Sequence, residues 1–113
     1  MKKIEAIIKP SKLSNVKDAL HEIGLSGMTV SDVKGFGRQR GQDGGLNSSP
    51  DYDDEFRVKI KIELIIEDKM VEKAIESIKN AAYSGKIGDG KIFIYTIDQV
   101  IRIRTGEKDS DAV

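Results

Sequence analysis

Apolar and polar side chains alternate along several stretches of this chain, and a period of two is typical of strands with one buried face. The clearest stretch runs from Phe56 to Glu67, where apolar residues occupy every even position. Shorter stretches of this kind lie at Lys3–Lys9, Met28–Lys34 and Val100–Arg104, whereas Ile92–Ile97 is apolar on both faces. We therefore predict four strands and a fifth, short C-terminal strand.

Two other stretches follow the 3.6-residue period of an amphipathic helix. The first begins after Pro10, with Ser11 as the expected N-cap, and ends at Gly24, a residue type that tolerates the left-handed conformation of helix ends. The second begins after Asp68, which we expect to cap it. The apolar positions are Leu13, Val16, Ala19, Leu20 and Ile23 in the first helix and Met70, Val71, Ala74, Ile75, Ile78, Ala81 and Ala82 in the second.

The order strand–helix–strand therefore occurs twice, which predicts an α+β domain of the ferredoxin-like, double βαβ kind. Two helices can cover only one face of a four-stranded sheet. The strand at Ile92–Ile97 is apolar on both faces, so the second face also needs a cover. In a chain of only 113 residues, we expect further copies of the chain to supply it, and so we predict a homo-oligomer.

Residues 37–55, between the two repeats, show no apolar periodicity. Connections in compact domains have a median length of about 4–6 residues, and much longer ones are usually functional or disordered. The segment begins with the basic residues Arg38 and Arg40 and ends with an acidic cluster that comprises Asp51, Asp53, Asp54 and Glu55.

The composition narrows the class of protein. With 113 residues, the chain is most simply one domain. Its 19 basic residues equal its 19 acidic ones, so it lacks the excess of positive charge that nonspecific nucleic-acid binding requires. It contains no cysteine, which excludes disulfides and thiolate metal sites. Because the apolar runs are short, we expect a soluble, cytoplasmic protein.

The strongest candidate for chemistry is a glycine-rich stretch at residues 84–91. Gly85, Gly88 and Gly90 leave the backbone N–H groups accessible to an anion, and Lys91 adds a positive charge. The spacing is similar to that of a P-loop, but Ile92 replaces the magnesium-binding hydroxyl and a strand follows instead of a helix. A helix cap at Gly85 with a turn is the alternative, and the composition favours phosphate contact.

Other charged residues are less specific. Arg102 and Arg104, at alternate positions, are suited to phosphate oxygens, but as a pair alone they favour a solvated strand face. Lys59 and Glu63 favour the ordinary polar face of a sheet. Arg38–Arg40, after a glycine-flanked turn, is similar to the rim of an anion site, although such turns are common. The residues contain no recognisable nucleophile–base set, so an enzyme has little support.

Five runs of residues resemble the PII nitrogen-regulatory signalling proteins, in family order and along nearly the whole chain. They are Met1–Pro10, Gly27–Val30, Val33–Gln39, Gly85–Phe93 and Val100–Glu107. The resemblance implies a single domain over 1–113 that forms a homotrimer, with ATP/ADP sites in the clefts between subunits. It also implies sensing of 2-oxoglutarate through a magnesium ion bound to ATP. Residues 37–55 then correspond to the T-loop, 84–91 to the B-loop and 99–113 to the C-terminal loop and tail.

The resemblance also implies the roles of individual residues. The nucleotide site would comprise Gly27, Met28 and Thr29 from the neighbouring subunit together with Gly35, Gly37, Arg38, Gln39, Glu63, Ile65, Gly88, Asp89, Gly90, Lys91, Arg102 and Arg104. The 2-oxoglutarate site would comprise Gly37, Gln39, Arg40, Gly41, Lys59 and Gly88. Gln39 would ligate Mg²⁺ through its side-chain oxygen. This assignment gives Lys59 and Glu63 a binding role that their pattern alone does not indicate.

The tip of the long segment departs from the family pattern. Leu46–Tyr52 replaces the usual Tyr-Arg-Gly-x-x-Tyr, and the segment is one residue longer. Tyr52 still falls near the tyrosine that is modified in the family, and Ser48 and Ser49 fall near a serine that is phosphorylated in some relatives. Because four acidic residues lie within three positions of Tyr52, we expect it to be a poor substrate for uridylylation.

We therefore predict a non-enzymatic trimeric sensor of ATP, ADP and 2-oxoglutarate. Its T-loop would regulate an ammonium transporter, which would be its only link to a membrane, or a metabolic enzyme. The alternative is a divergent PII-like sensor that binds a nucleotide but responds to another metabolite and serves another pathway. An RNA-binding module with the same element order lacks support, since paired exposed aromatics at alternate positions and a basic excess are both missing.

Overall fold

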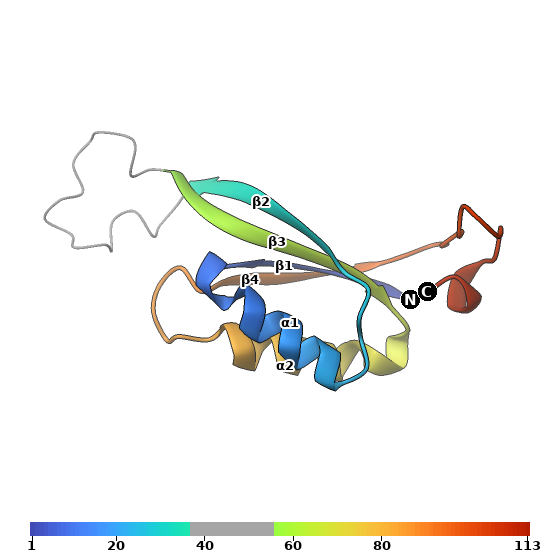
Figure 1. Ribbon diagram of the computed structural model, residues 1–113, viewed down its shortest axis with the longest axis horizontal. Coiled ribbons are helices and arrows are strands. Elements are labelled where there is room, and N and C mark those ends of the chain that lie inside the picture. The colour runs from blue at the N-terminus through green and yellow to red at the C-terminus, as the bar shows by residue number, and fades with distance from the viewer. Residues whose placement is uncertain (37–55) are drawn as a thin grey trace, which may run out of the picture.

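The computed structural model describes residues 1–36 and 56–113. These residues form four strands and two α-helices in the predicted order (Figure 1). The strands are β1 (Lys2–Ile8), β2 (Thr29–Phe36), β3 (Phe56–Ile66) and β4 (Gly90–Thr96), and the helices are α1 (Leu13–Glu22) and α2 (Val71–Ala82). The doubled strand–helix–strand prediction is confirmed.

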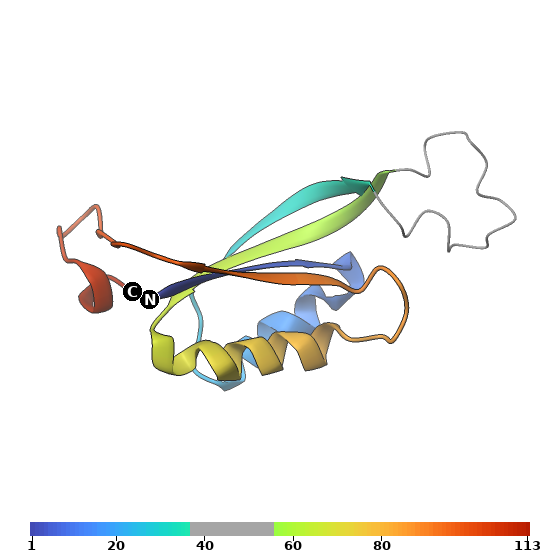
Figure 2. The same ribbon diagram turned by 180° about the vertical axis from the view of Figure 1, so that it is seen from behind.

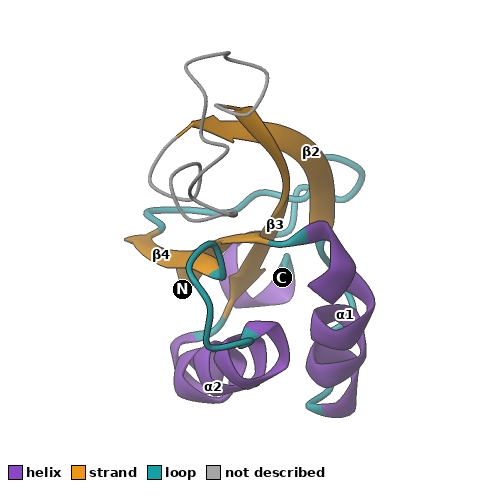
Figure 3. Cartoon of the chain, turned by 90° about the vertical axis from the view of Figure 1, so that its left-hand side faces the viewer, coloured by secondary structure: helices purple, strands orange, loops and turns teal. Residues whose placement is uncertain are grey.

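The strands form one antiparallel sheet in the order β2-β3-β1-β4. Each helix links two strands that run the same way and leaves a gap between them, which a strand of the other repeat fills. Ile4 at the centre of β1 therefore pairs with Leu64 of β3 on one side and Ile94 of β4 on the other. Both helices lie on the same face of the sheet (Figure 3). This is the ferredoxin-like arrangement that the sequence predicts.

The core lies between the helices and that face of the sheet. Alternate residues of β1 and β3 are buried there, as the period of two predicts. The buried apolar residues are Ile4, Ala6, Ile8, Ile60, Ile62, Leu64 and Ile66 from the strands and Val16, Leu20, Ala74, Ile78 and Ala82 from the helices. The helical stripes predicted from the sequence therefore face the sheet.

Both predicted helix caps are wrong. A 3₁₀ turn, Pro10–Lys12, precedes α1 and contains Ser11, and no side chain caps this helix. A second 3₁₀ turn, Asp68–Met70, precedes α2, and Asp68 pairs instead with the N-terminal ammonium at 2.8 Å. In each turn, the carbonyl of the residue before the turn accepts a hydrogen bond from the backbone N–H three residues later. That N–H therefore needs no capping side chain. The predicted stop at Gly24 is confirmed, with a φ of 89°.

The predicted C-terminal strand is wrong as well. The residues after β4 form no strand; they contain an isolated bridge between Ile101 and Lys108, on either side of a tight turn, and a 3₁₀ turn at Asp109–Asp111. The N–H of Gly106 donates to the carbonyl of Arg102 at 2.8 Å and closes this turn. The segment extends past the end of the sheet that is opposite to the loop between α2 and β4 (Figures 1 and 2). Alternation of side chains does not by itself make a strand where no neighbouring strand pairs with the segment.

The second face of the sheet has no helix against it among the described residues (Figure 2). Because Ile4 points into the core, its strand neighbours Lys3 and Glu5 point to this second face, and the pairing places Tyr95 and Phe93 beside them. Phe93 is 41% exposed and Tyr95 is 46% exposed. The expectation that another copy of the chain covers this face remains a prediction.

Candidate functional site

The glycine-rich stretch forms the loop between α2 and β4. Tyr83, directly after helix α2, is the C-cap and is extended, so Gly85 is not the cap. Gly85, Gly88 and Gly90 have φ values of 82°, 101° and 105°. All three lie in the region that glycine tolerates and other residues rarely adopt. The loop leads directly into a strand, as expected, and it therefore differs from a P-loop.

Gly90 is required for a second reason, its distance to strand β1. It opens β4 and pairs with Ile8. A Cβ atom at this position would lie 1.7 Å from the carbonyl oxygen of Ile7. The backbones of the loop and of β1 are thus in direct contact here, and any side chain would push them apart.

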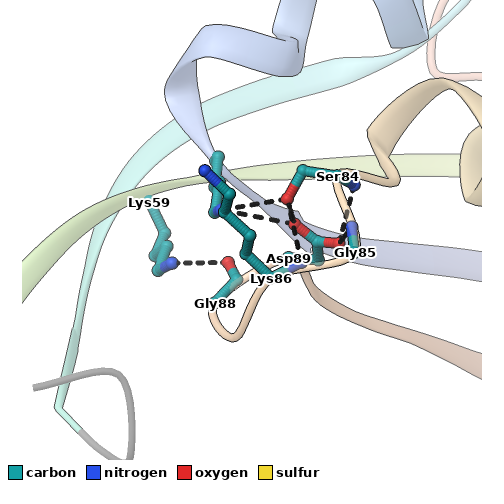
Figure 4. A network of polar contacts seen from close by, with 7 residues as sticks. Lys59, Ser84, Gly85, Lys86, Gly88 and Asp89 are labelled. Atoms are coloured by element: carbon teal, nitrogen blue, oxygen red, sulfur yellow. Dashed lines mark hydrogen bonds and ion pairs between the residues drawn. The ribbon is translucent and has the colours of Figure 1, made fainter. Parts of the chain in front are cut away.

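Asp89 holds the loop together from within (Figure 4). Its Oδ2 accepts hydrogen bonds from the backbone N–H of Ser84 at 2.8 Å and of Gly85 at 3.0 Å. Its Oδ1 accepts from the Ser84 hydroxyl and pairs with Lys9 Nζ at 3.3 Å. Burial by itself would raise the pKa of Asp89, but these four contacts outweigh it and hold the pKa well below its usual range.

Lys59 links the same loop to strand β3. Its Nζ donates to the carbonyl oxygen of Gly88 at 2.8 Å (Figure 4). The residue is only 9% exposed, so the solvated polar face that its sequence pattern favours is wrong for Lys59. Gly35 lies beside it, and a Cβ atom there would lie 3.7 Å from Lys59 Cγ. The fold thus gathers Gly35, Lys59 and Gly88 at one end of the sheet.

A cleft of about 560 Å³ lies at the other end. Five of the predicted nucleotide-binding residues line it, together with residues of the C-terminal segment, of the start of β1 and of β3. These are Gly27, Met28, Thr29, Glu63 and Ile65, with Lys3, Leu64, Val100, Ala112 and Val113. The sheet register explains part of this grouping, because Thr29 of β2 pairs with Glu63 of β3.

An ion pair between Lys3 and Glu63, at 2.7 Å, forms one wall of this cleft. The hydrogen bond from Lys3 lowers the pKa of Glu63 and raises that of Lys3. Lys3 also lies over the ring of Tyr95, at 5.3 Å from its centroid. The cleft therefore offers a carboxylate, held in place by a lysine, beside apolar groups.

The two predicted phosphate-binding arginines lie in the C-terminal segment. Arg102 pairs with Glu107 at 3.5 Å, and it donates to the carbonyl of Ala112 at 3.4 Å. Ala112 in turn lines the cleft. Arg104 follows in the turn and is exposed. The arginines thus belong to the same end of the molecule as the cleft, but they do not project from one strand as predicted.

The predicted site residues therefore fall into two groups, which we call the loop group and the cleft group. The loop group comprises Gly35, Lys59, Gly88, Asp89, Gly90 and Lys91, and the cleft group comprises Gly27, Met28, Thr29, Glu63, Ile65, Arg102 and Arg104. Thr29 and Gly35 are six positions apart on strand β2, which corresponds to roughly 20 Å. A single chain thus does not bring the two groups into one site.

The family model of nitrogen regulatory protein P-II matches residues 1–107. The chain belongs to the P-II family. It is 61% identical to the P-II protein of Rhodospirillum rubrum and 57% identical to that of Azospirillum brasilense, over the full length of both chains in each comparison. A solved structure of Arabidopsis thaliana PII bound to citrate matches with a TM-score of 0.81 and 39% identity, over 99% of this chain and 91% of that one. The protein is thus a signalling protein of the nitrogen-regulatory P-II family, with the predicted ferredoxin-like fold.

Several predicted site residues of this P-II protein lie outside the described residues. They are Gly37, Arg38, Gln39, Arg40 and Gly41 of the nucleotide and 2-oxoglutarate sites and Ser48, Ser49 and Tyr52 of the modification sites. Within residues 1–36 and 56–113, the structure shows no cluster of three or more acidic or histidine side chains that could hold a metal ion. None of the helices there is long and apolar enough to cross a membrane.

The structure also adds three residues that the sequence analysis missed, Lys3, Lys9 and Ser84. Lys3 holds Glu63 in the cleft group, and Lys9 and Ser84 hold Asp89 in the loop group. The position of Lys9 follows from the pairing of β1 with β4, which only the tertiary structure shows. Since Ile8 pairs with Gly90, the residue after β1 must lie close to the residue before β4.

Proposed function

We propose that this P-II protein binds ATP and ADP in sites that two neighbouring subunits of a homotrimer build together. The observation that carries the proposal is the division of the predicted site residues into two groups at opposite ends of the sheet. The loop group offers backbone N–H groups and Lys91 for phosphates. The cleft group offers apolar walls and a carboxylate for a nucleoside. Each group alone is half a site.

A second copy completes the site if its cleft group lies against the loop group of the first. Such a contact joins two different surfaces, and contacts of this kind close into a ring when the rotation between copies allows it. A ring of three copies would contain three equal sites. It would also bring the uncovered faces of the three sheets together, which supports the same arrangement.

We further propose that 2-oxoglutarate is the second effector and that it binds beside the nucleotide. Gln39 would supply an oxygen ligand to a magnesium ion, and the metal would join the nucleotide to the effector. Gly37, Arg40, Gly41 and Gly88 would contact the effector through their backbones. The buried ammonium of Lys59 would face a carboxylate of the effector. The Arabidopsis relative bound citrate, which is also a polycarboxylate, and this supports a carboxylate effector here.

The output would be the T-loop at residues 37–55, which leaves the sheet between β2 and β3. Gly35 and Lys59 lie close to the two ends of this segment, so an effector bound there can change the positions of both ends. The loop would then bind an ammonium transporter or a metabolic enzyme. In this proposal the protein acts in the cytoplasm and catalyses no reaction itself.

Calorimetric titration of ATP tests the nucleotide site. Replacing Arg104 by alanine removes one charge-assisted phosphate contact, and we expect ATP to bind about tenfold to a hundredfold more weakly. Lys73→Ala, which removes an exposed positive charge from α2, is the matched control and should leave the affinity unchanged. Equal affinities of Arg104→Ala and the wild type would remove this arginine from the site.

Titration of 2-oxoglutarate, with and without ATP and Mg²⁺, separates the proposal from its alternative. If the metal joins the two ligands, each should strengthen the binding of the other by the same factor. If 2-oxoglutarate binds equally well without nucleotide, or fails to bind, the protein is a divergent P-II-like sensor of another metabolite.

A further inference from the structure

Asp89 occupies an unusual position for an acidic residue, because it lies inside the loop that is proposed to bind phosphates. A negative charge near an anion site weakens the binding of the anion, so an acidic residue there is expected to have another role. All the contacts of this carboxylate among the described residues lie within the loop or with Lys9, which follows strand β1. The contacts of the side chain therefore indicate that it stabilises the loop and does not bind a ligand.

All four contacts suit an ionised carboxylate. Two partners are backbone N–H groups, the third is an ammonium and the fourth is a hydroxyl that donates to Asp89, so all four are donors. An ionised carboxylate accepts about four hydrogen bonds, whereas an asparagine amide accepts two and donates two. If Asp89 were asparagine, its NH₂ group would face either the two backbone N–H groups or the Lys9 and Ser84 side chains.

This arrangement joins the two ends of the loop. It ties Asp89 back to Ser84 and Gly85, where helix α2 has just ended, and it fastens both to the end of β1 through Lys9. Two further contacts hold the residues on either side of Asp89. Lys59 holds the carbonyl of Gly88, and Gly90 is held by its direct approach to Ile7. These contacts constrain the backbone of the loop on both sides of Asp89.

We propose that Asp89 is a positioning residue that sets the phosphate-binding conformation of the loop, through Ser84, Gly85 and Lys9, without contacting the nucleotide. The proposal rests on the proposed function, in which this loop holds the nucleotide phosphates. It gives Asp89 a different role from the direct nucleotide contact that the family resemblance implies. The low pKa of Asp89 supports it, since the carboxylate stays ionised at physiological pH.

The direction in which one substitution changes the affinity for ATP distinguishes this role from a purely electrostatic one. If Asp89 acted only through its charge, Asp89→Asn would remove repulsion and strengthen ATP binding. If Asp89 positions the loop, the same variant should bind ATP at least about tenfold more weakly, although its site is more positive. Asp18→Asn, the same chemical change at an exposed position of α1, is the matched control and should bind ATP as the wild type does.

Hydrogen exchange of the ligand-free protein gives a readout that does not depend on the nucleotide. The amides of Ser84 and Gly85 should exchange at least about tenfold faster in Asp89→Asn than in the wild type, while the core amides of β3 should be unchanged. Unchanged exchange at both amides would overturn the proposal, and so would equal or tighter binding of ATP. If the wild type itself fails to bind ATP, the proposed function falls, and exchange still decides whether Asp89 holds the loop.

A second, milder variant keeps the test decisive if Asp89→Asn does not fold. Ser84→Ala removes the hydroxyl, which donates to Asp89 and accepts from Lys9 and from the N–H of Lys86, and it leaves the backbone N–H to Asp89 in place. We expect weaker ATP binding in the same direction but by a smaller factor. We also expect the double variant to lose less than the product of the two single losses, because both act on one network. A wild-type affinity in folded Ser84→Ala would overturn the proposal.

Discussion

At the scale of single residues, Gly90 shows how closely the loop and the sheet are built together. Two constraints act on this one position. Its φ of 105° is costly for any residue with a side chain, and the carbonyl of Ile7 occupies the space that a Cβ atom would need. The composition of the loop indicates that glycine is needed here. It does not show whether the group that approaches the glycine backbone is a ligand or strand β1.

We therefore expect Gly90→Ala to lower the free energy of unfolding by more than about 2 kcal/mol, since a backbone must move to accept the methyl group. Gly24→Ala is the matched control. Gly24 has a similar φ of 89°, but no atom lies within 4 Å of an added Cβ, so only the backbone strain of about 1 kcal/mol applies. Urea denaturation at one protein concentration measures both. Equal losses in the two variants would contradict the contact with Ile7.

Asp89 and Lys59 show the other side of residue-level prediction. The sequence identified both positions as candidates through the family resemblance, but it did not identify their partners. Lys59 bonds to Gly88, 29 positions away, and Lys9 bonds to Ser84, 75 positions away. Contacts over such separations depend on the order of strands, which no local pattern contains.

At the scale of elements, strand β3 carries the core of the sheet. It pairs with β1 and β2, one on each side, and its even-numbered residues from Ile60 to Ile66 are buried against the helices. The alternation that predicts this strand is a direct consequence of backbone geometry, because successive side chains point to opposite faces. The prediction of β3 was therefore accurate to within one residue at its end.

Ile62, at the centre of β3, is completely buried. We expect Ile62→Ala to lower the free energy of unfolding by about 2–5 kcal/mol, through lost burial and the cavity that remains. Ile103→Ala makes the same change at a fully exposed position and should alter it by less than about 0.5 kcal/mol. Thermal or urea unfolding gives the comparison. A loss below about 1 kcal/mol for Ile62→Ala would contradict its place in the core.

At the scale of the whole molecule, the described residues pack against one face of the sheet and leave the other face open. Phe93 and Tyr95 of the edge strand β4 lie on the open face, beside Glu5 and Lys3 of β1. The open face and the two half-sites lead to the same expectation, which is a closed assembly of copies. Assembly would bury the aromatic residues and complete the nucleotide sites in one step.

Light scattering coupled to gel filtration tests this expectation. The wild type should have the mass of a trimer, whereas Phe93→Glu should shift toward the monomer, because assembly would bury an unpaired charge on this face. Asn15→Glu is the control, since Asn15 is exposed on α1, which packs against the other face of the sheet. A monomeric wild type, or a trimeric Phe93→Glu, would contradict assembly through this face.

The sequence by itself determined the repeated strand–helix–strand order, the buried face of each element and, through the resemblance of long ordered runs, the P-II family. These follow from local periodicity and from residue identity, which are both present in the linear chain. It did not determine the starts of the helices, where a 3₁₀ turn takes the place of a side-chain cap. Nor did it determine the end of the chain, where Val100–Arg104 alternates but has no strand to pair with.

Only the tertiary structure decided which site residues lie together. Strand order and register place Lys59 beside Gly88 and Lys9 beside Asp89, and they separate Thr29 from Gly35 along the length of β2. The physical reason is that hydrogen bonds and ion pairs form between groups that are close in space, while the sequence orders residues along the chain. The carboxylate of Asp89 thus has its role in the loop only because β1, α2 and β4 meet at one end of the sheet.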